Sequence, residues 1–294
     1  MKHLFIVNPV AGKGKTLPII AEIKEAFKGI NEEYIIEVTE RPGHATEIVK
    51  KYVKMEDYRV YSVGGDGTLN EVLNGIVNSK SSLAIIPSGT GNDFIKSICK
   101  DLNKSDLLHR TINGKEEFID LAKVNDRYFI NISSVGFDAE VVYNTVELKK
   151  LPFVKGSFSY VLGILLTLFS FKSCNINIKI DENEINANTT LIAIANGKYY
   201  GGGMMIAPMA IINDGILDVC LIKKVNKIKL LALLPTLIKG SHEEIKEVSF
   251  HRGKRISIVS KDDIALNIDG EVCKVKEVIF EVIHNGIEIV IPSS

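Results

Sequence analysis

The feature that most constrains this chain is a glycine-rich segment around one acid, residues 64–71, with the sequence GGDGTLNE. It directly follows the apolar run 58–63, so it lies where a strand ends and a helix begins. Three glycines in four residues cost conformational entropy on folding. In open α/β sheets, ligands bind at the carboxyl ends of the strands. We therefore expect a binding loop around Asp66 in an α/β domain, and we rank a plain Asp-Gly turn below it.

The first part of the chain alternates between strand and helix patterns. Strands are predicted at 3–8, 34–38, 58–63 and 83–87, and helices at 16–28, 45–55 and 69–77. Repeated βα units of this kind produce a parallel sheet with flanking helices. We place this α/β domain at residues 1–120.

Strand patterns dominate the rest of the chain, residues 121–294, which we interpret as a β-rich antiparallel second domain. Strands are predicted at 118–124, 128–135, 176–180, 189–195, 217–222, 248–250, 256–259, 265–268, 278–283 and 287–291. Turn chemistry at Asn125-Asp126 and Asn285-Gly286 joins some of them as hairpins. Two helices, 157–171 and 227–238, interrupt the strands. Whether the last strand returns to the first domain is left open.

Two further segments of the first domain, 8–15 and 87–94, end strands in the same way. Backbone N–H groups of a glycine-rich turn and a following helix N-terminus can bind phosphate. The segment 8–15 fits neither a Walker A loop, whose first glycine would fall at Pro9, nor a Rossmann fingerprint, whose third glycine would fall at Leu17. A plain strand-to-helix turn explains 8–15 equally well, and Asp93 is equally well a helix N-cap.

Composition excludes several classes of protein. Lys+Arg and Asp+Glu are both 36, so no global positive field favours nucleic acid. The four cysteines are scattered without a C-x-x-C pair, which argues against zinc and for a reduced, cytoplasmic protein. The longest apolar stretch, 158–171, is shorter than the ~20 residues that span a bilayer.

Together these segments resemble the diacylglycerol kinase catalytic family, soluble bacterial lipid kinases related to sphingosine kinases and, more distantly, to NAD kinases. The resemblance is carried by 64–71 (GGDGTLNE), 87–94 (PSGTGNDF), 136–139 (GFDA) and 267–271 (NIDGE), in this order. It implies a nucleotide-binding α/β domain, a β-rich lipid-binding domain and an active site in the cleft between them.

The resemblance also implies roles for individual residues. Those that would bind ATP are Asn8, Pro9, Val10, Ala11, Gly12, Thr39, Gly64, Gly65, Asp66, Gly67, Thr68, Leu69, Asn70 and Thr90. Asp66 would organise the Mg²⁺ of Mg-ATP, and Glu271 would be the general base, with its carboxylate facing the cleft and free of a tight Arg or Lys partner. A structural Mg²⁺ site would use Ile211, Asp214 and Ile216.

Several alternatives stay open. The acceptor could be another lipid alcohol, of the phosphatidylglycerol or sphingoid type, or a soluble substrate as in NAD kinases; a non-catalytic regulator would need neither Asp66 nor Glu271. A homodimer is possible. We expect transient, peripheral membrane contact through Lys149, Lys150 and Lys155, which flank the apolar stretch 158–171. That stretch is interpreted as a core helix that also forms one wall of an acyl-chain pocket.

Overall fold

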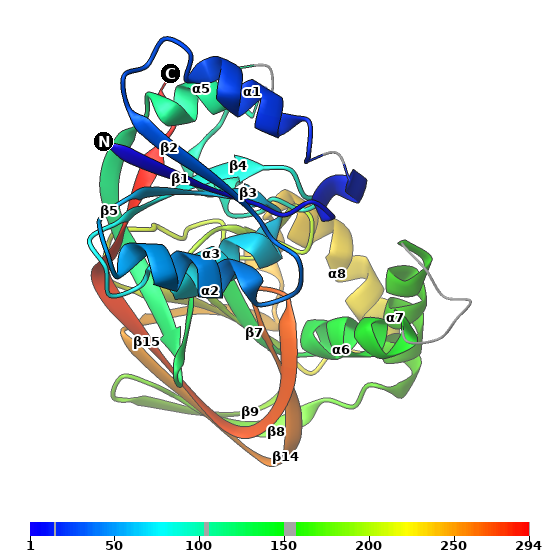
Figure 1. Ribbon diagram of the computed structural model, residues 1–294. Coiled ribbons are helices and arrows are strands. Elements are labelled where there is room, and N and C mark those ends of the chain that lie inside the picture. Colours follow the sequence, from blue (N-terminus) through cyan, green and yellow to red (C-terminus); the bar gives the residue numbers. More distant parts are fainter. Residues whose placement is uncertain (15, 103–105, 150–156, 294) are drawn as a thin grey trace.

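The apolar runs at the start of the chain form four strands that pair in parallel, in the order β2-β1-β3-β4. The elements are β1 (Lys2–Val7), η1 (Ala11–Gly14), α1 (Ile19–Ala26), β2 (Glu33–Val38), α2 (His44–Val53), β3 (Arg59–Gly64), α3 (Asp66–Ile76) and β4 (Ser82–Pro87). Figure 1, a computed structural model, shows α1 on one face of this sheet and α2 and α3 on the other. We call this part of the molecule the first lobe.

Side chains of β1 alternate between the two layers of the first lobe. Phe5 packs on the α1 side, where its ring stacks on Tyr61 with centroids 4.1 Å apart. Leu4 and Ile6 pack on the side of α2 and α3. Because helices cover both faces, β3 and β4 are buried along their whole length, as is usual for parallel strands.

The second lobe is built of antiparallel strands and three longer helices. Its strands are β5 (Lys115–Val124), β6 (Arg127–Phe129), β7 (Ile132–Gly136), β8 (Cys174–Ile180), β9 (Asn183–Ala195), β10 (Tyr199–Tyr200), β11 (Met204–Met205), β12 (Leu217–Lys223), β13 (Val248–Gly253), β14 (Arg255–Ile268) and β15 (Glu271–Ile291). Its longer helices are α6 (Phe137–Lys149), α7 (Ser157–Ser170) and α8 (Lys227–Lys239); the short ones in the chain are α4 (Ile95–Ile98), α5 (Leu107–Ile112) and η2 (His242–Glu244).

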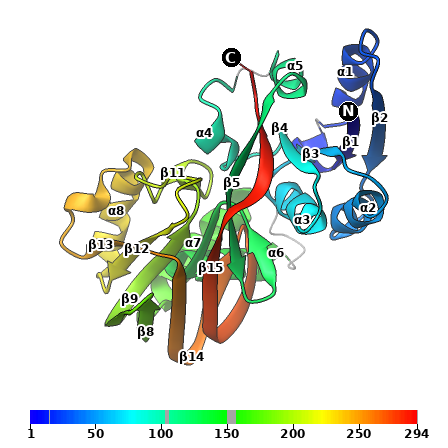
Figure 2. The same cartoon turned by 90° about the vertical axis from the view of Figure 1, so that its left-hand side faces the viewer.

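The two lobes share one sheet. Within the described residues, 1–14, 16–102, 106–149 and 157–293, 13 strands form a continuous sheet, and only the β10–β11 hairpin is separate. The strand β15 pairs antiparallel with β14 and β5 and then parallel with β4, through Ile289 and Leu83. The last strand therefore returns to the first lobe, as Figure 2 shows.

The predicted hairpin at Asn285-Gly286 is wrong. Residues 278–283 and 287–291 belong to one strand, β15, whose register with β5 shifts between Ile283 and Ile287. Asn285 has φ 53°, so the residue types that favour a tight turn serve here in an irregularity of the strand. The predicted strands 256–259 and 265–268 are likewise one strand, β14, with a register shift between Val259 and Ile264.

The short helices α4 and α5 were not predicted, and two longer helices also differ from prediction. The helix α6 was not predicted, because its apolar residues are spread around the helix rather than gathered on one face. The helix α3 begins at Asp66, three residues before the predicted start, so the acid lies in its first turn. Among the described residues, no helix is long and apolar enough to cross a membrane.

The packing of α2 on α3 depends on Gly75. A Cβ atom at this position would lie 2.7 Å from Val49 Cβ and 3.2 Å from the Thr46 carbonyl oxygen. We expect Gly75→Ala to lower the free energy of unfolding in urea by roughly 1–3 kcal/mol, because α2 must move away. The control is Gly67→Ala in the same helix, where nothing lies within 4 Å of the added Cβ; it should leave stability unchanged or slightly raised. Equal destabilisation of the two variants would contradict this account.

Candidate active site at the junction of the two lobes

The Asp66 carboxylate holds two loops of the first lobe together. Its Oδ1 accepts the backbone N–H of Asp93 at 2.8 Å, and its Oδ2 accepts that of Asn92 at 2.9 Å. Burial raises the pKa of Asp66, and the nearby Asp93 carboxylate raises it further. The Asp66 carboxylate therefore fixes the loop 88–93 against the first turn of α3.

The glycines of the two loops allow this close approach. A Cβ atom on Gly89 would lie 2.5 Å from Gly65 Cα, and one on Gly91 would lie 2.6 Å from Asp66 Oδ2. Gly67 is different, since its side-chain position is open. Close packing therefore requires glycine at positions 65, 89 and 91. At Gly67 the absence of a side chain leaves the main chain accessible instead.

The end of β1 joins the same cluster. Asn8 Nδ2 donates to Thr68 Oγ1 at 2.9 Å, and Asn8 Oδ1 accepts the N–H of Val10 at 3.1 Å. Thr39, at the end of β2, donates its N–H to the Val7 carbonyl at 2.9 Å. The strand ends that carry Asn8, Thr39 and Asp66 therefore lie at one edge of the parallel sheet.

Two other predicted residues lie differently. Thr90 is exposed at the tip of its loop. Leu69 packs in the core of the first lobe, so only its backbone can face a ligand.

The second lobe reaches this edge through Asp269, which follows β14. Its Oδ2 accepts Asn70 Nδ2 at 3.1 Å, and its carboxylate also accepts the backbone N–H groups of Ile130 and Ile132 at 3.3 and 3.2 Å. From sequence Asp269 was included in the segment 267–271 but was given no role of its own, so its role as a bridge was missed. A polar side chain four residues into α3, Asn70, was the available signal for a partner.

Burial raises the pKa of Asp269 to about 6, from an ordinary value of about 4. Between these two values the folded protein binds more protons at this group than the unfolded chain does. The contribution of Asp269 to the free energy of unfolding therefore falls as the pH rises from about 4 to about 6.

Asp93 forms a second bridge between the lobes. The sequence left open whether this residue is a helix N-cap or a binding residue. Its Oδ1 accepts Lys96 Nζ at 2.7 Å, and its Oδ2 accepts the N–H of Gly202, in the β10–β11 turn, at 2.7 Å. The residue therefore links the loop held by Asp66 to the second lobe.

Glu271 lies two residues after Asp269, at the start of β15. Its Oε2 lies 2.5 Å from Arg127 Nη2, and its side chain is 53% exposed. The expectation that Glu271 has no tight basic partner is wrong. The two residues are 144 positions apart. They lie on β6 and β15, which are linked because β5 pairs with both strands.

Two family models and many known proteins match this chain. The diacylglycerol kinase catalytic domain model matches residues 2–124, and the YegS C-terminal NAD kinase beta sandwich-like domain model matches residues 131–291. A probable lipid kinase YegS-like from Yersinia enterocolitica is 33% identical over 92% of this chain and 92% of the relative. A diacylglycerol kinase from Bacillus subtilis is 28% identical over 90% and 88%.

The chain belongs to the diacylglycerol kinase-like family of lipid kinases. Its fold is also that of a putative diacylglycerol kinase from Bacillus anthracis, whose crystal structure superposes with a TM-score of 0.78 at 23% identity, covering 99% of this chain and 97% of that one.

In this lipid kinase the segment predicted to bind a structural metal is held by protein groups. Asp214 Oδ1 accepts the N–H of Ile216 at 3.2 Å, and Asp214 Oδ2 pairs with the Arg252 guanidinium. Ile211 is exposed. The described part of the chain contains no cluster of three or more His, Cys, Asp or Glu side chains that could hold a metal ion. The metal site at Ile211, Asp214 and Ile216 stays a prediction.

A buried acid of the lipid kinase fixes the same segment. Asp120, within β5, accepts the N–H of Gly215 at 2.5 Å and that of Asn285 at 3.0 Å, and it pairs with His284 Nδ1 at 2.7 Å. Sequence reasoning passed over it, although an acid inside an apolar strand, FIDLA, is itself a signal of a special environment.

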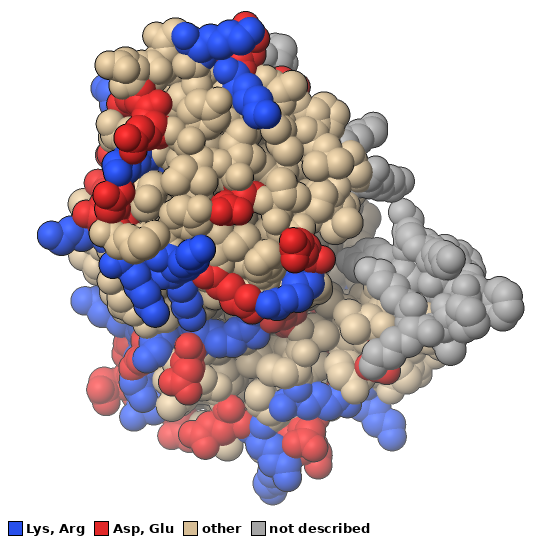
Figure 3. Space-filling model, in the orientation of Figure 1, with Lys and Arg blue, Asp and Glu red and all other residues tan. Residues whose placement is uncertain are grey.

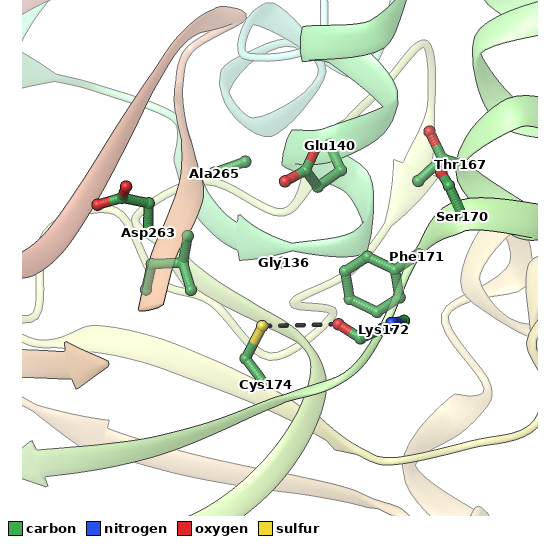
Figure 4. A pocket seen from close by; sticks show the side chains of 10 residues that line it. Gly136, Glu140, Thr167, Ser170, Phe171, Lys172, Cys174, Asp263 and Ala265 are labelled. Atoms are coloured by element: carbon green, nitrogen blue, oxygen red, sulfur yellow. Dashed lines mark hydrogen bonds between the residues drawn. The ribbon is translucent and has the colours of Figure 1, made fainter. Parts of the chain in front are cut away.

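A cavity of about 230 Å³ lies between α6, α7 and the sheet of the second lobe (Figure 4). Its walls combine apolar and charged side chains. They are Gly136, Glu140, Thr167, Ser170, Phe171, Lys172, Cys174, Asp263, Ile264 and Ala265. The end of α7 thus contributes to a cavity wall, while its Leu168 packs in the core.

Charge on the face shown in Figure 3 is mixed, with Lys and Arg interspersed with Asp and Glu. Lys150 and Lys155, predicted to contact a membrane, lie outside the described residues, and Lys149 is the last residue of α6.

The substitution Asp66→Asn should affect both stability and activity. An amide has one acceptor oxygen, so one of the two backbone N–H groups at Asn92 and Asp93 loses its partner. We expect loss of kinase activity together with a free energy of unfolding lower by roughly 1–3 kcal/mol, rather than an unchanged fold. The exposed Asp57→Asn, at the other end of β3, is the control. Wild-type stability and turnover in Asp66→Asn would refute the role of this carboxylate.

Proposed function

We propose that this lipid kinase transfers the γ-phosphate of ATP to the free hydroxyl of a diacylglycerol-like lipid. The observation that carries the proposal is the meeting of the Asp66 loops with Asp269 of the second lobe. In the reaction the acceptor oxygen forms a bond to the γ-phosphorus, the bond to the ADP oxygen breaks, and the acceptor proton moves to a base.

The nucleotide would be bound mainly by main-chain groups. The open Gly67 and the first turn of α3 offer N–H groups and the positive end of a helix dipole to a phosphate. The residues proposed are those from Asn8 to Gly12, Thr39, those from Gly64 to Asn70, and Thr90. Leu69 would take part through its backbone only.

The donors around Asp66 suit Mg²⁺. This ion is usually held by one or two carboxylates together with phosphate oxygens and water. Asp66 Oδ2 and Asp93 Oδ2 both lie near the position of a Gly91 Cβ atom, at 2.6 and 3.5 Å. These two carboxylates would hold the ion, which when bound neutralises charge on the transferred phosphate. Because ionisation is required, binding should weaken at acid pH, where the raised pKa of Asp66 favours its neutral form.

Glu271 remains the proposed general base. The ion pair with Arg127 uses Oε2, so the acceptor proton would move to Oε1. Its place at the start of β15, directly after the Asp269 bridge, supports the proposal, since this bridge fixes the turn against α3.

The acceptor would lie along the second lobe. Asp269 and Ala265, a wall residue of the cavity in Figure 4, are four residues apart, or roughly 13 Å along an extended strand. A glycerol backbone beside Asp269 could therefore direct an acyl chain toward this cavity. Phe171, Ile264 and Ala265 would contact the chain, and the charged wall residues would restrict how deeply it enters.

One assay tests the proposed reaction. Purified protein is given Mg²⁺ and ATP with mixed micelles of diacylglycerol, phosphatidylglycerol, a ceramide or undecaprenol, and with soluble NAD, and the products are identified by mass spectrometry. We expect phosphatidic acid as the main product. If another lipid alcohol is phosphorylated instead, the protein is still a lipid kinase but the proposed acceptor is wrong. Phosphorylation of NAD alone would overturn the proposal.

The base is tested by Glu271→Gln, which keeps the size of the side chain but cannot take a proton. We expect kcat to fall by about 10²–10⁴-fold with the KM for ATP little changed. The control is Glu277→Gln, an exposed glutamate on the same strand. If Glu271→Gln keeps its kcat, positioning and charge neutralisation account for the catalysis without this base.

A further inference from the structure

The helix α8 has two apolar faces, of which only one is covered. Leu230, Leu233 and Leu237 are buried against the second lobe. Ile228, Leu231, Pro235 and Ile238 recur every three or four residues on another face and are exposed, Ile228 to 82% and Ile238 to 59%. A helix that only covers a core has polar residues there.

The exposed apolar face continues onto α7. Lys227 Nζ donates to the Phe169 carbonyl at 2.9 Å and lies 5.3 Å from the centroid of the Phe169 ring. Phe169 itself is 73% exposed, and Leu166, one turn earlier, is also exposed. We call the surface formed by Leu166, Phe169, Ile228, Leu231, Pro235 and Ile238 the α7–α8 surface; Figure 2 shows α8 at the outer edge of the molecule.

Basic residues border the α7–α8 surface. Lys223 and Lys224, just before α8, and Lys227 and Lys239, in its first and last turns, are exposed. The helix itself contains no acid; Glu243 and Glu244 follow beyond its C-terminal end, and Lys229 pairs with Glu247 at 2.6 Å.

This combination favours a lipid surface over a protein partner. Every charged side chain within α8 is a lysine, so this border of the apolar surface carries charge of one sign. Helices that lie in the plane of a membrane combine an apolar face with flanking lysines that reach anionic headgroups.

We propose that the α7–α8 surface docks on an anionic lipid bilayer, with Phe169 and Ile228 in the headgroup region and Lys223, Lys224 and Lys239 near lipid phosphates. The inference rests on the proposed function, because a diacylglycerol-like acceptor is held in a membrane.

Vesicle co-sedimentation without ATP tests the docking surface. Vesicles of phosphatidylcholine are compared with vesicles that also contain phosphatidylglycerol. We expect the full chain to prefer the anionic vesicles, and the double variant Ile228→Ser with Leu231→Ser to bind roughly tenfold more weakly or worse. The control is Met55→Ser, which removes a 62% exposed apolar side chain at the end of α2; it should bind like the wild type.

The charged border is tested separately by Lys223→Gln with Lys224→Gln. Each lysine near an anionic surface contributes about fivefold to binding, so the pair should lower binding to anionic vesicles by roughly 25-fold and leave binding to neutral vesicles unchanged. Added salt should act in the same direction.

Three results would overturn the proposal: no preference of the wild type for anionic vesicles, an equal loss in Met55→Ser, or a dimer that Ile228→Ser dissociates with no change in vesicle binding. The last result would assign the surface to a second copy of the chain.

A short-chain diacylglycerol in solution separates this proposal from the proposed function. If that acceptor is phosphorylated but the protein does not bind vesicles, the docking surface is rejected and the kinase activity stands.

Discussion

The hydrogen bonding of β15 is the constraint on which the arrangement of the two lobes depends. This strand of 21 residues pairs with β14 and β5 in the second lobe and then reaches β4 of the first. It begins at Glu271, immediately after the turn that carries Asp269, so the pairing that joins the lobes also fixes where the second lobe meets α3. The candidate site is positioned by the sheet, and the side-chain bridges of Asp269 and Asp93 complete the junction.

Two physical reasons explain the glycines of these segments. Gly65, Gly89 and Gly91 let two loops approach until their backbones and the Asp66 carboxylate are in contact, whereas Gly67 is open. The same glycine-rich segments thereby hold the two loops together and leave main-chain groups accessible to a ligand. The same carboxylate accepts hydrogen bonds from two backbone N–H groups in the protein alone, which is why its removal should affect stability as well as chemistry.

Local patterns predicted the strands and helices of the first lobe well, because their apolar periods and glycine-rich ends are properties of neighbouring residues. Non-local features could not be predicted in this way. Arg127 and Glu271 meet only after the sheet has formed, and nothing near Glu271 in the sequence reveals a partner. The hairpin prediction at Asn285-Gly286 was wrong for another reason. A residue at positive φ occurs both in hairpin turns and in strand irregularities, so the same residue types fit both. The helix α6, without one apolar face, left no periodic signal.

The position of β15 also sets an order on folding as the chain leaves the ribosome. Until the segment around Ile289 emerges, β4 is an edge strand with unpaired backbone groups, since its partner Ile289 is 206 positions beyond Leu83. Edge strands of this kind pair readily with other chains. The first lobe, although made first, therefore cannot complete its sheet until β15 has been made. Chains that stop early should be the aggregation-prone species, and long-range pairing of this kind also slows folding.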